Sequence, residues 1–205
     1  MSFKIVFIDD NMREGLDNPF VRSIGKFQKD ADLSVFKDPL EGLTYVLNNL
    51  NNQMIVFLDC KFDGYGLQGI NVLRQIREKT SLLYIVMMSA NAISQISSLD
   101  IIEMINEDYI WFFDRNNGTF TDASKLIDRI KNLWKTRFDC ILEKWILKHP
   151  EDADKFAFRE AGGNSYTWAE MLKQLRLQTD VGKLFEGMVN EYYIYQLLKS
   201  EESNG

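Results

Sequence analysis

The sequence is poor in the residues that build disulfide frameworks and zinc sites. Its 205 residues include two cysteines, Cys60 and Cys140, and one histidine, His149. Two cysteines are too few for a disulfide framework, so we expect a reducing, cytoplasmic setting. A single histidine far from either cysteine in the sequence also argues against a zinc site.

Long hydrophobic runs and an excess of basic residues are also missing. The longest apolar runs, such as residues 84–88 and 110–113, are far shorter than the roughly 20 residues that span a bilayer, so no membrane segment is expected. The N-terminus likewise lacks the pattern of a signal peptide. With 24 basic and 30 acidic residues the net charge is −6, which makes nucleic acid an unlikely partner.

The first 120 residues alternate between short apolar runs and helical patterns. Hydrophobic residues are spaced for helices over 38–50 and 67–78, and Asp38-Pro39 is a typical helix start. Continuous apolar runs suit strands that are covered on both faces. We therefore predict an α/β fold, a five-stranded doubly wound parallel sheet of the flavodoxin type. Its strands are expected at residues 3–8, 33–36, 54–58, 83–88 and 109–113.

The remainder of the chain is predicted to be helical. Helical spacing over residues 121–148 indicates one long helix, with a break conceivable near Arg137, that joins two domains. We place these at 1–136, receiver-like for the reasons given below, and 137–205, an all-helical domain for output or interaction. Thr167 and Glu170 form a capping-box pattern that opens a helix in the second domain.

Acidic side chains follow two of the predicted strands at the point where each strand ends. Asp9-Asp10 ends the first, Asp59 ends the third, and Ser89 ends the fourth. Ligands of open parallel sheets sit at this edge, so three carboxylates and a hydroxyl should meet there. Such a cluster suits Mg²⁺, and a carboxylate beside Mg²⁺ can accept a phosphoryl group.

These stretches, in their order and spacing, resemble the receiver domain of response regulators. The matching segments are Lys4–Asn11, Ile55–Asp59, Gly69–Arg77, Val86–Ala90 and Asp108–Ile110. The resemblance implies that Asp59 is the phosphoacceptor and that Ser89 contacts the phosphoryl group.

The resemblance also implies a metal site and a switch. Asp9, Asp10, Asp59 and the backbone carbonyl of Lys61 would hold Mg²⁺. Tyr109 matches the switch aromatic of the fifth strand.

One feature of receivers is missing from the sequence. A lysine usually follows the fifth strand, but counting from Tyr109 puts Phe112 at that position, and no lysine lies between Lys79 and Lys125. Arg115 replaces the lysine only if the strand carries an insertion. Metal binding and phosphoryl acceptance depend mainly on the carboxylates, so conformational readout is the property most affected.

We therefore predict a two-component signalling protein and not an enzyme, with at most autophosphatase activity. A histidine kinase or phosphotransfer protein would phosphorylate Asp59, and the change would pass to the C-terminal helices. These helices would bind an output protein or a second copy of the chain. A phosphorylation-independent adaptor is the alternative hypothesis.

A DNA-binding regulator is the weaker alternative. The predicted helices at 167–177 and 181–199 have the order of a helix-turn-helix. Residues 137–205, however, hold 9 basic and 12 acidic residues, whereas a helix that reads DNA should be basic.

Overall fold

The computed structural model describes residues 3–90 and 96–202. The chain divides into two compact units, Met1–Leu133 and Trp134–Gly205. Each unit is described here by itself. Within the described residues, no helix is both long enough and apolar enough to span a membrane.

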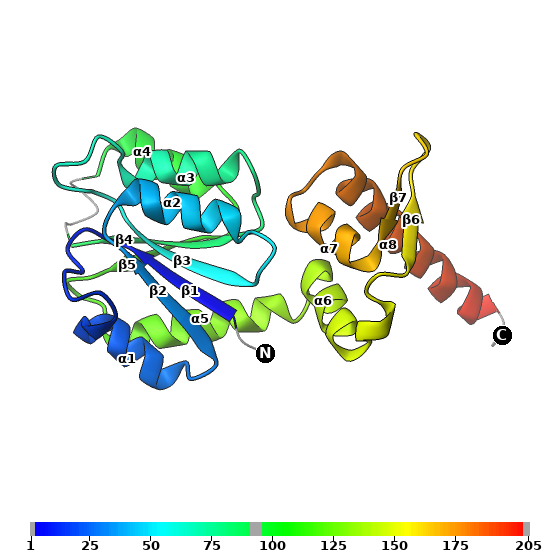
Figure 1. Cartoon of the computed structure of the whole chain (residues 1–205), viewed down its shortest axis with the longest axis horizontal. Coiled ribbons are helices and arrows are strands. Elements are labelled where there is room, and N and C mark those ends of the chain that lie inside the picture. The colour runs from blue at the N-terminus through cyan, green and yellow to red at the C-terminus, as the bar shows by residue number, and fades with distance from the viewer. Residues whose placement is uncertain (1–2, 91–95, 203–205) are drawn as a thin grey trace. The chain divides into compact units, whose positions relative to one another are not determined.

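The first unit is built on a five-stranded parallel sheet (Figure 1). The strand order is β2-β1-β3-β4-β5, the order of the flavodoxin-type doubly wound fold. The predicted fold class is therefore confirmed. The strands are β1 (Phe3–Ile8), β2 (Ala31–Phe36), β3 (Met54–Asp59), β4 (Tyr84–Ser89) and β5 (Ile110–Asp114).

Helices cover both faces of this sheet. In Figure 1, α1 (Pro19–Phe27) and α5 (Phe120–Trp134) lie on one face. The opposite face carries α2 (Pro39–Asn48), α3 (Gly69–Arg77) and α4 (Ser98–Asn106), and a short 3-10 turn, η1 (Gly15–Asp17), precedes α1. Because all residues of β3 and β4 are buried between these layers, both strands read as continuous apolar runs.

The start of α2 shows how local sequence sets a boundary. Asp38 takes an extended conformation, and its carboxylate accepts hydrogen bonds from the backbone N–H groups of Leu40 and Glu41. Pro39 occupies the first helical position, where no N–H donor is needed.

The stretch 121–148 is not one continuous helix but is divided near Arg137, where the sequence allowed a break. The structure has two helices, α5 and α6 (Phe138–Lys148), separated at residues 135–137. Arg137 adopts an extended backbone with ψ of 134°, which ends the hydrogen-bond ladder of α5. A new ladder begins when the N–H of Ile141 donates to the carbonyl of Arg137 at 3.0 Å.

The second unit is mainly helical, as expected, but it also contains a two-stranded antiparallel hairpin that was not predicted. The hairpin joins β6 (Phe156–Arg159) to β7 (Ser165–Thr167) and follows the 3-10 turn η3 (Pro150–Asp152). Two helices complete the unit, α7 (Trp168–Arg176) and α8 (Asp180–Glu202). Gly163, at φ +95°, lies in the hairpin turn, where a left-handed conformation favours glycine.

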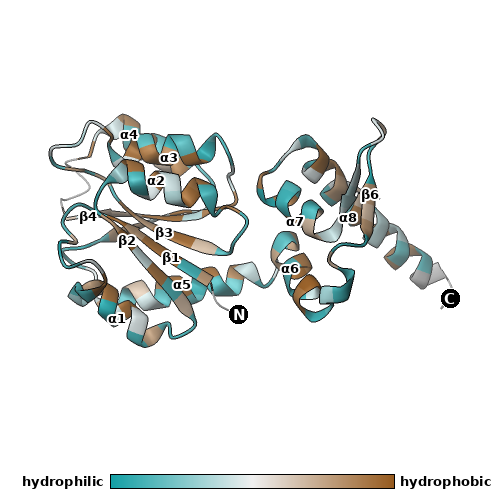
Figure 2. Cartoon of the chain, viewed as in Figure 1, coloured by the Kyte–Doolittle hydropathy of each residue, from teal (hydrophilic) through white to brown (hydrophobic). Residues whose placement is uncertain are grey.

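Apolar side chains from every layer of the second unit meet in one core. Leu142, Met171, Leu175 and Phe185 are buried at its centre. Phe158 and Trp168 pack against them from the hairpin and from α7. The predicted capping box is present, since Thr167 and Glu170 each accept a hydrogen bond from the other's backbone N–H. Figure 2 shows brown, apolar colour along the strands of the first unit's sheet.

Candidate functional site

The three predicted carboxylates meet at the carboxyl edge of the sheet. β1 and β3 run in parallel register, with Ile8 opposite Leu58, so Asp9 and Asp59 end their strands side by side. Asp9 is fully buried, Asp59 is 6% exposed, and Asp10 is partly exposed. Each offers an oxygen within 4.8 Å of the others, a spacing that suits one shared cation.

Arg115 is the basic side chain of this site. It follows β5, and its backbone N–H donates to the carbonyl of Ser89 at 2.9 Å. Its guanidinium hydrogen-bonds the Asp9 carboxylate and lies 3.7 Å from an Oδ of Asp59. The side chain is 26% exposed, so it is held mostly inside the site. Arg115 thus places a positive charge between the two buried carboxylates.

One arginine does not compensate the negative charge. Burial and the neighbouring Asp9 carboxylate together raise the pKa of Asp59 to about 7, although Arg115 acts in the opposite direction. Burial also raises the pKa of Asp9, against the attraction of Arg115. The two buried carboxylates share a single guanidinium, so the site still carries excess negative charge that a further cation would neutralise.

Ser89 lies at the same edge, at the end of β4 and almost fully buried. It is opposite Asp114 of β5, one residue before Arg115. A cavity of about 290 Å³ adjoins it, lined among others by Lys61, Asn71 and Asp100. The hydroxyl predicted to contact a phosphoryl group is thus placed one strand away from Asp59.

The loop after β3 folds back onto the acidic cluster. The N–H of Asp63 donates to Asp10 at 3.1 Å, and the N–H of Lys61 makes a longer contact of 3.4 Å with Asp59. Gly69 closes the loop so tightly that a Cβ there would lie 2.0 Å from the carbonyl oxygen of Asp59. The Lys61 carbonyl as a metal ligand stays a prediction.

Gln68 organises this loop, although it was not among the predicted site residues. Its side-chain amide donates to the carbonyls of Phe62 and Tyr65 and accepts from the N–H of Phe62, each at 2.9–3.0 Å. Phe62 is buried beneath the loop. The signal in the sequence was the length of the loop, because a long ordered loop needs side chains that satisfy its own backbone groups.

The assignment of Tyr109 as the switch aromatic is wrong. Tyr109 precedes β5 at φ +57°, and its carbonyl accepts from Ile85 near the amino end of β4. Its ring packs on Tyr84 with centroids 4.7 Å apart. Since a strand rises about 3.3 Å per residue, five residues separate Tyr84 from Ser89 by on the order of 17 Å. Tyr109 therefore lies at the opposite edge of the sheet from the carboxylates.

Phe112, the residue that the sequence count placed at the lysine position, lies on β5, three residues after Tyr109 and three before Arg115. It is half-buried opposite Met87 and lines a cavity of about 410 Å³ with Met104 and Ile105 of α4. Phe112 is thus the aromatic side chain on β5 itself, whereas Tyr109 lies just before the strand.

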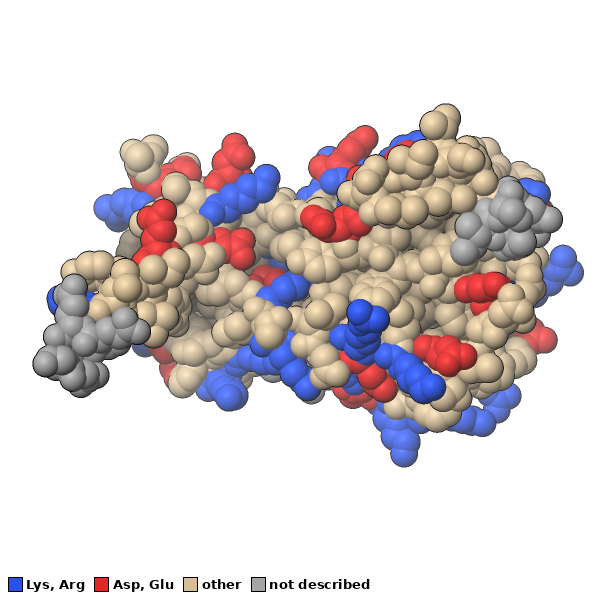
Figure 3. Space-filling view, turned by 180° about the vertical axis from the view of Figure 1, so that it is seen from behind, with Lys and Arg blue, Asp and Glu red and all other residues tan. Residues whose placement is uncertain are grey.

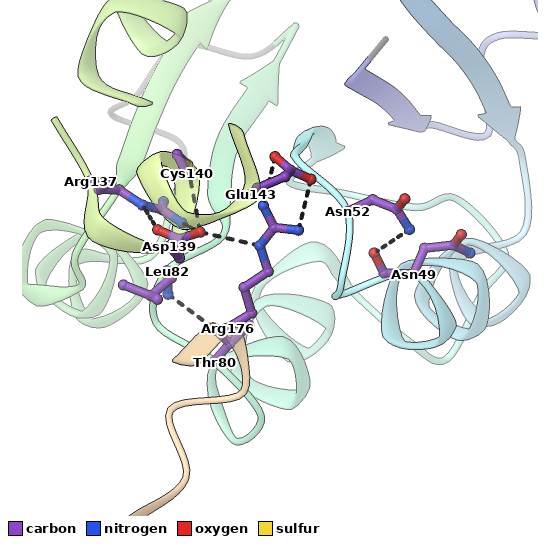
Figure 4. Close-up of polar contacts among 9 residues, drawn as sticks. All are labelled: Asn49, Asn52, Thr80, Leu82, Arg137, Asp139, Cys140, Glu143 and Arg176. Carbon is purple, nitrogen blue, oxygen red and sulfur yellow. Dashed lines mark hydrogen bonds and ion pairs between the residues drawn. The ribbon is translucent and has the colours of Figure 1, made fainter. Parts of the chain in front are cut away.

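A second group of buried charges lies in the C-terminal unit (Figure 4). Asp139 of α6 accepts two hydrogen bonds from Arg137, both at 2.9 Å, and one from Arg176 of α7 at 3.2 Å. Arg176 also contacts Glu143 at 3.0 Å. Burial opposes the charge of Asp139, but the two arginines outweigh it and hold its pKa below the usual range. Two arginines thus balance two carboxylates, which is typical of a structural network.

The two cysteines carry no reactive thiolate. Burial raises the pKa of Cys60 and of Cys140 to about 12 each, so both thiols stay neutral at physiological pH. A neutral thiol is a poor nucleophile, so Cys60 is not a candidate for the chemistry of the site, although it adjoins Asp59.

No family model and no curated protein matches the chain, whereas several solved structures are similar to part of it. Among solved structures, a receiver domain protein from Clostridium thermocellum is 22% identical, with a TM-score of 0.49, over 65% of this chain and 97% of its own. The receiver domain of NtrX from Brucella abortus is 19% identical, with a TM-score of 0.45, over 61% and 94%. A CheY-like receiver from Methanospirillum hungatei is 14% identical, with a TM-score of 0.46, over 63% and 93%.

The strand order, and not these values, defines the class of the first unit. The order β2-β1-β3-β4-β5 and the helices on both faces are those of the flavodoxin-type fold, which receiver domains share. The first unit therefore has the fold of receiver domains and is called the receiver-like unit below.

Proposed function

We propose that the chain is a response-regulator-like signalling protein in which Asp59 accepts a phosphoryl group from a histidine kinase or phosphotransfer protein. The observation that carries the proposal is the cluster of Asp9, Asp10 and Asp59 at the carboxyl edge of a receiver-like sheet. Ser89 ends β4 and Arg115 directly follows β5, and both would contact the anionic phosphoryl group.

The reaction needs a carboxylate nucleophile and a nitrogen leaving group. An ionised Oδ of Asp59 forms a bond to phosphorus while the bond between phosphorus and the partner's imidazole nitrogen breaks. The departing imidazole keeps the bonding electron pair and takes a proton from solvent, and Asp59 becomes an acyl phosphate. Because the pKa of Asp59 is raised to about 7, the step requires that the site favour the ionised form of this carboxylate.

Carboxylate oxygens are the donors that Mg²⁺ prefers, so Asp9, Asp10 and Asp59 fit this ion, with the Lys61 carbonyl as a proposed further ligand. Bound there, Mg²⁺ would neutralise charge on the transferring phosphoryl oxygens. Arg115 supplies the fixed positive charge that a lysine supplies in other receivers. Its fork of N–H donors suits an anion with several oxygens.

The route to the output begins at β4 and β5. Ser89 would hydrogen-bond the phosphoryl group, and Phe112 lies on the neighbouring strand against α4. A shift of Ser89 toward the phosphoryl group would open space that Phe112 fills. The exposed apolar side chains of α4, Leu99, Ile102 and Ile105, would be the surface that reports this change.

A second candidate function has an observation in its favour. The hydrogen bond of Arg115 to Asp9 occupies a carboxylate that Mg²⁺ would need. If this ion pair replaces the metal, the domain is a pseudo-receiver, and the protein is an adaptor that binds partners without phosphorylation.

The two candidates are separated by one experiment with a small phosphoryl donor. Phosphoramidate carries a phosphorus–nitrogen bond like that of phosphohistidine, and intact mass spectrometry counts the phosphoryl groups gained. We expect one group in Mg²⁺ and none in EDTA or in Asp59→Asn. Asp32→Asn, at an exposed carboxylate of β2, is the matched control and should behave like wild type.

Trp111 of β5 provides an independent reading of the same site. Beryllofluoride with Mg²⁺ mimics the phosphoryl group and should change tryptophan fluorescence in wild type but not in Asp59→Asn. Absence of both the mass gain and the fluorescence change in wild type would reject the phosphoacceptor proposal and favour the adaptor.

A further inference from the structure

The loop after β3 contains a backbone carbonyl, that of Lys61, that accepts no hydrogen bond from the residues that the structure describes. Its two neighbours are both paired. The carbonyl of Cys60 accepts from the N–H of Gly69 at 3.3 Å, and the carbonyl of Phe62 accepts from the side chain of Gln68 at 3.0 Å. The Lys61 carbonyl therefore remains available to a cation at the neighbouring carboxylates.

Gln68 holds the peptide group that carries this carbonyl. Its Oε1 accepts from the N–H of Phe62 at 3.0 Å, and that N–H belongs to the same planar peptide group as the Lys61 carbonyl. The described peptide bonds are all trans, so the N–H and the C=O of this group point in opposite directions. The hydrogen bond to Gln68 thus fixes the peptide plane and turns the Lys61 carbonyl away from Gln68.

Gln68 is itself held in place. Its amide nitrogen also donates to the carbonyl of Tyr65 at 2.9 Å, so both ends of the amide are engaged. Phe62 is 1% exposed, and its ring meets that of Tyr65 edge to face, with the centroids 6.3 Å apart. The next residue, Gly69, lies against the carbonyl of Asp59. Gln68 therefore ties the loop to the end of the strand that carries Asp59.

The tip of the loop offers no other support of this kind. Gly64 takes a left-handed conformation at φ +80°, and Gly66 follows two residues later. A Cβ added at either glycine would meet no atom within 4 Å, so packing does not restrain the backbone there. The geometry of the loop near the carboxylates therefore depends on the hydrogen bonds of Gln68.

We propose that Gln68 is a positioning residue of the metal site and orients the Lys61 carbonyl as a ligand of Mg²⁺. The inference rests on the magnesium site of the proposed function and adds a residue that acts through the backbone. Mg²⁺ demands ligands at near-ideal octahedral positions, so a carbonyl on an unrestrained peptide group binds it poorly. Groups that orient metal ligands typically contribute about 10–100-fold to the affinity.

The experiment reads the metal at the Lys61 carbonyl itself. Figure 3 shows Asp and Glu side chains (red) spread over one face of the chain, and such exposed carboxylates hold Mg²⁺ loosely, so total binding is not specific enough. In full-length protein with carbonyl ¹³C in lysine and ¹⁵N in phenylalanine, a triple-resonance NMR spectrum shows only the Lys–Phe peptide groups. The sequence contains three such pairs, Lys26-Phe27, Lys61-Phe62 and Lys155-Phe156.

The two outer pairs serve as internal controls. Lys26→Arg and Lys155→Arg each remove one signal and thereby identify all three. In wild type, Mg²⁺ should shift the carbonyl signal of Lys61 and leave the other two unchanged, because they lie at the end of α1 and at the start of β6.

Gln68→Met removes all three hydrogen bonds at similar side-chain length. It should raise the dissociation constant of Mg²⁺ on the order of tenfold and reduce the shift of the Lys61 carbonyl at saturating Mg²⁺. Gln75→Met, at an exposed glutamine of α3, is the matched control and should behave like wild type. An unchanged Lys26-Phe27 signal establishes that the first unit of each variant is folded.

The outcomes separate this inference from the proposed function. A Gln68→Met variant with wild-type affinity, or with a weaker affinity but an unchanged carbonyl shift, would overturn the role of Gln68 and leave the proposed function intact. Wild-type binding that calorimetry detects without a shift at Lys61 would also overturn it, because the carboxylates would then hold the ion without this carbonyl. Absence of Mg²⁺ binding in wild type would reject the metal site and the role of Gln68 together.

Discussion

Each of the two units buries an aspartate beside arginine, yet the pKa values of the two carboxylates are shifted in opposite directions. The pKa of Asp59 in the receiver-like unit is raised to about 7, whereas that of Asp139 in the C-terminal unit is lowered. Both side chains are almost fully buried, so burial alone does not explain the difference. The number of arginines that each carboxylate meets does.

At the first site Arg115 is shared between Asp9 and Asp59, with Asp10 close by. Negative charge is in excess there, and this excess destabilises the folded state of the first unit. In the second network Arg137 and Arg176 balance the carboxylates. An uncompensated cluster is typical of a site that awaits a cation or a reaction, and a balanced one of a site that holds helices together.

The largest effect is expected from breaking the balanced network. Asp139→Asn leaves the buried guanidinium of Arg176 and the partly buried one of Arg137 without their shared carboxylate, which should lower the free energy of unfolding of the C-terminal unit by about 3 kcal/mol. Urea denaturation followed by the fluorescence of Trp145 and Trp168 measures this loss.

The acid response of this variant gives a second check. Because the pKa of Asp139 is lowered by folding, its stabilising contribution is present above about pH 4, the usual range of aspartate, and is lost as the pH falls through the lowered value. The gap between wild type and Asp139→Asn should therefore narrow below pH 4. A gap that stays constant would show that charge is not the source of the stability.

An aspartate-to-asparagine substitution in the first unit should have the opposite effect and raise the free energy of unfolding. The folded state holds the proton of Asp59 more tightly than the unfolded chain does, so stability falls as the pH rises from about 4 to 7. Asp59→Asn removes this charge and should stabilise the receiver-like unit by on the order of 1–3 kcal/mol at pH 8.

Thermal unfolding in EDTA at pH 8 and pH 4 tests this prediction. The gain should be present at pH 8 and largely absent at pH 4, where wild type is protonated as well. Equal stability of wild type and Asp59→Asn at pH 8 would mean that the negative charge of the first site is also fully compensated.

A smaller effect is expected from removing Arg115, the guanidinium that Asp9 and Asp59 share. Arg115→Ala frees the Asp9 carboxylate and leaves the cluster more negative, so Mg²⁺ should bind several-fold more tightly, a change of about 1 kcal/mol. Isothermal titration calorimetry with MgCl₂ measures the affinity, and Arg129→Ala, at an arginine that packs on Trp111, is the matched control. Unchanged affinity in Arg115→Ala would count against competition between the guanidinium and the metal.

The smallest effects are expected from exchanging arginine for lysine in both units. Arg137 binds both oxygens of Asp139, and lysine cannot keep that geometry, so Arg137→Lys should cost about 1 kcal/mol. Arg115 contacts each carboxylate through one nitrogen, so Arg115→Lys should change stability by less than about 0.5 kcal/mol. Denaturant titrations of the two variants decide whether fork geometry distinguishes the sites.

Much of the receiver-like unit could be predicted because its signals are local. β3 and β4 are continuous apolar runs, and each ends in a polar residue, Asp59 or Ser89, at a shared edge. Parallel strands bring such ends together whatever the details of their connections. The acidic cluster therefore followed from strand positions alone.

The errors arose where a choice between neighbouring residues depends on packing. Tyr109 and Phe112 are both aromatic and three residues apart, and only the register of β5 against β4 shows which of them lies near Ser89. The hairpin at 156–167 was missed because its strands are three and four residues long, too short for an alternating pattern to stand out. The break at Arg137 depends on backbone geometry between two stretches that share one helical period.

The sequence by itself determined the fold class of the first unit and the carboxylates of its site, because apolar periodicity and strand-end residues act over short distances. Only the tertiary structure decided which basic side chain pairs with those carboxylates. The partner of Asp9 is Arg115, which lies 106 residues further along the chain. Such a contact is set by the register of the strands and by the free energy of burying charge, and neither is written in the local sequence.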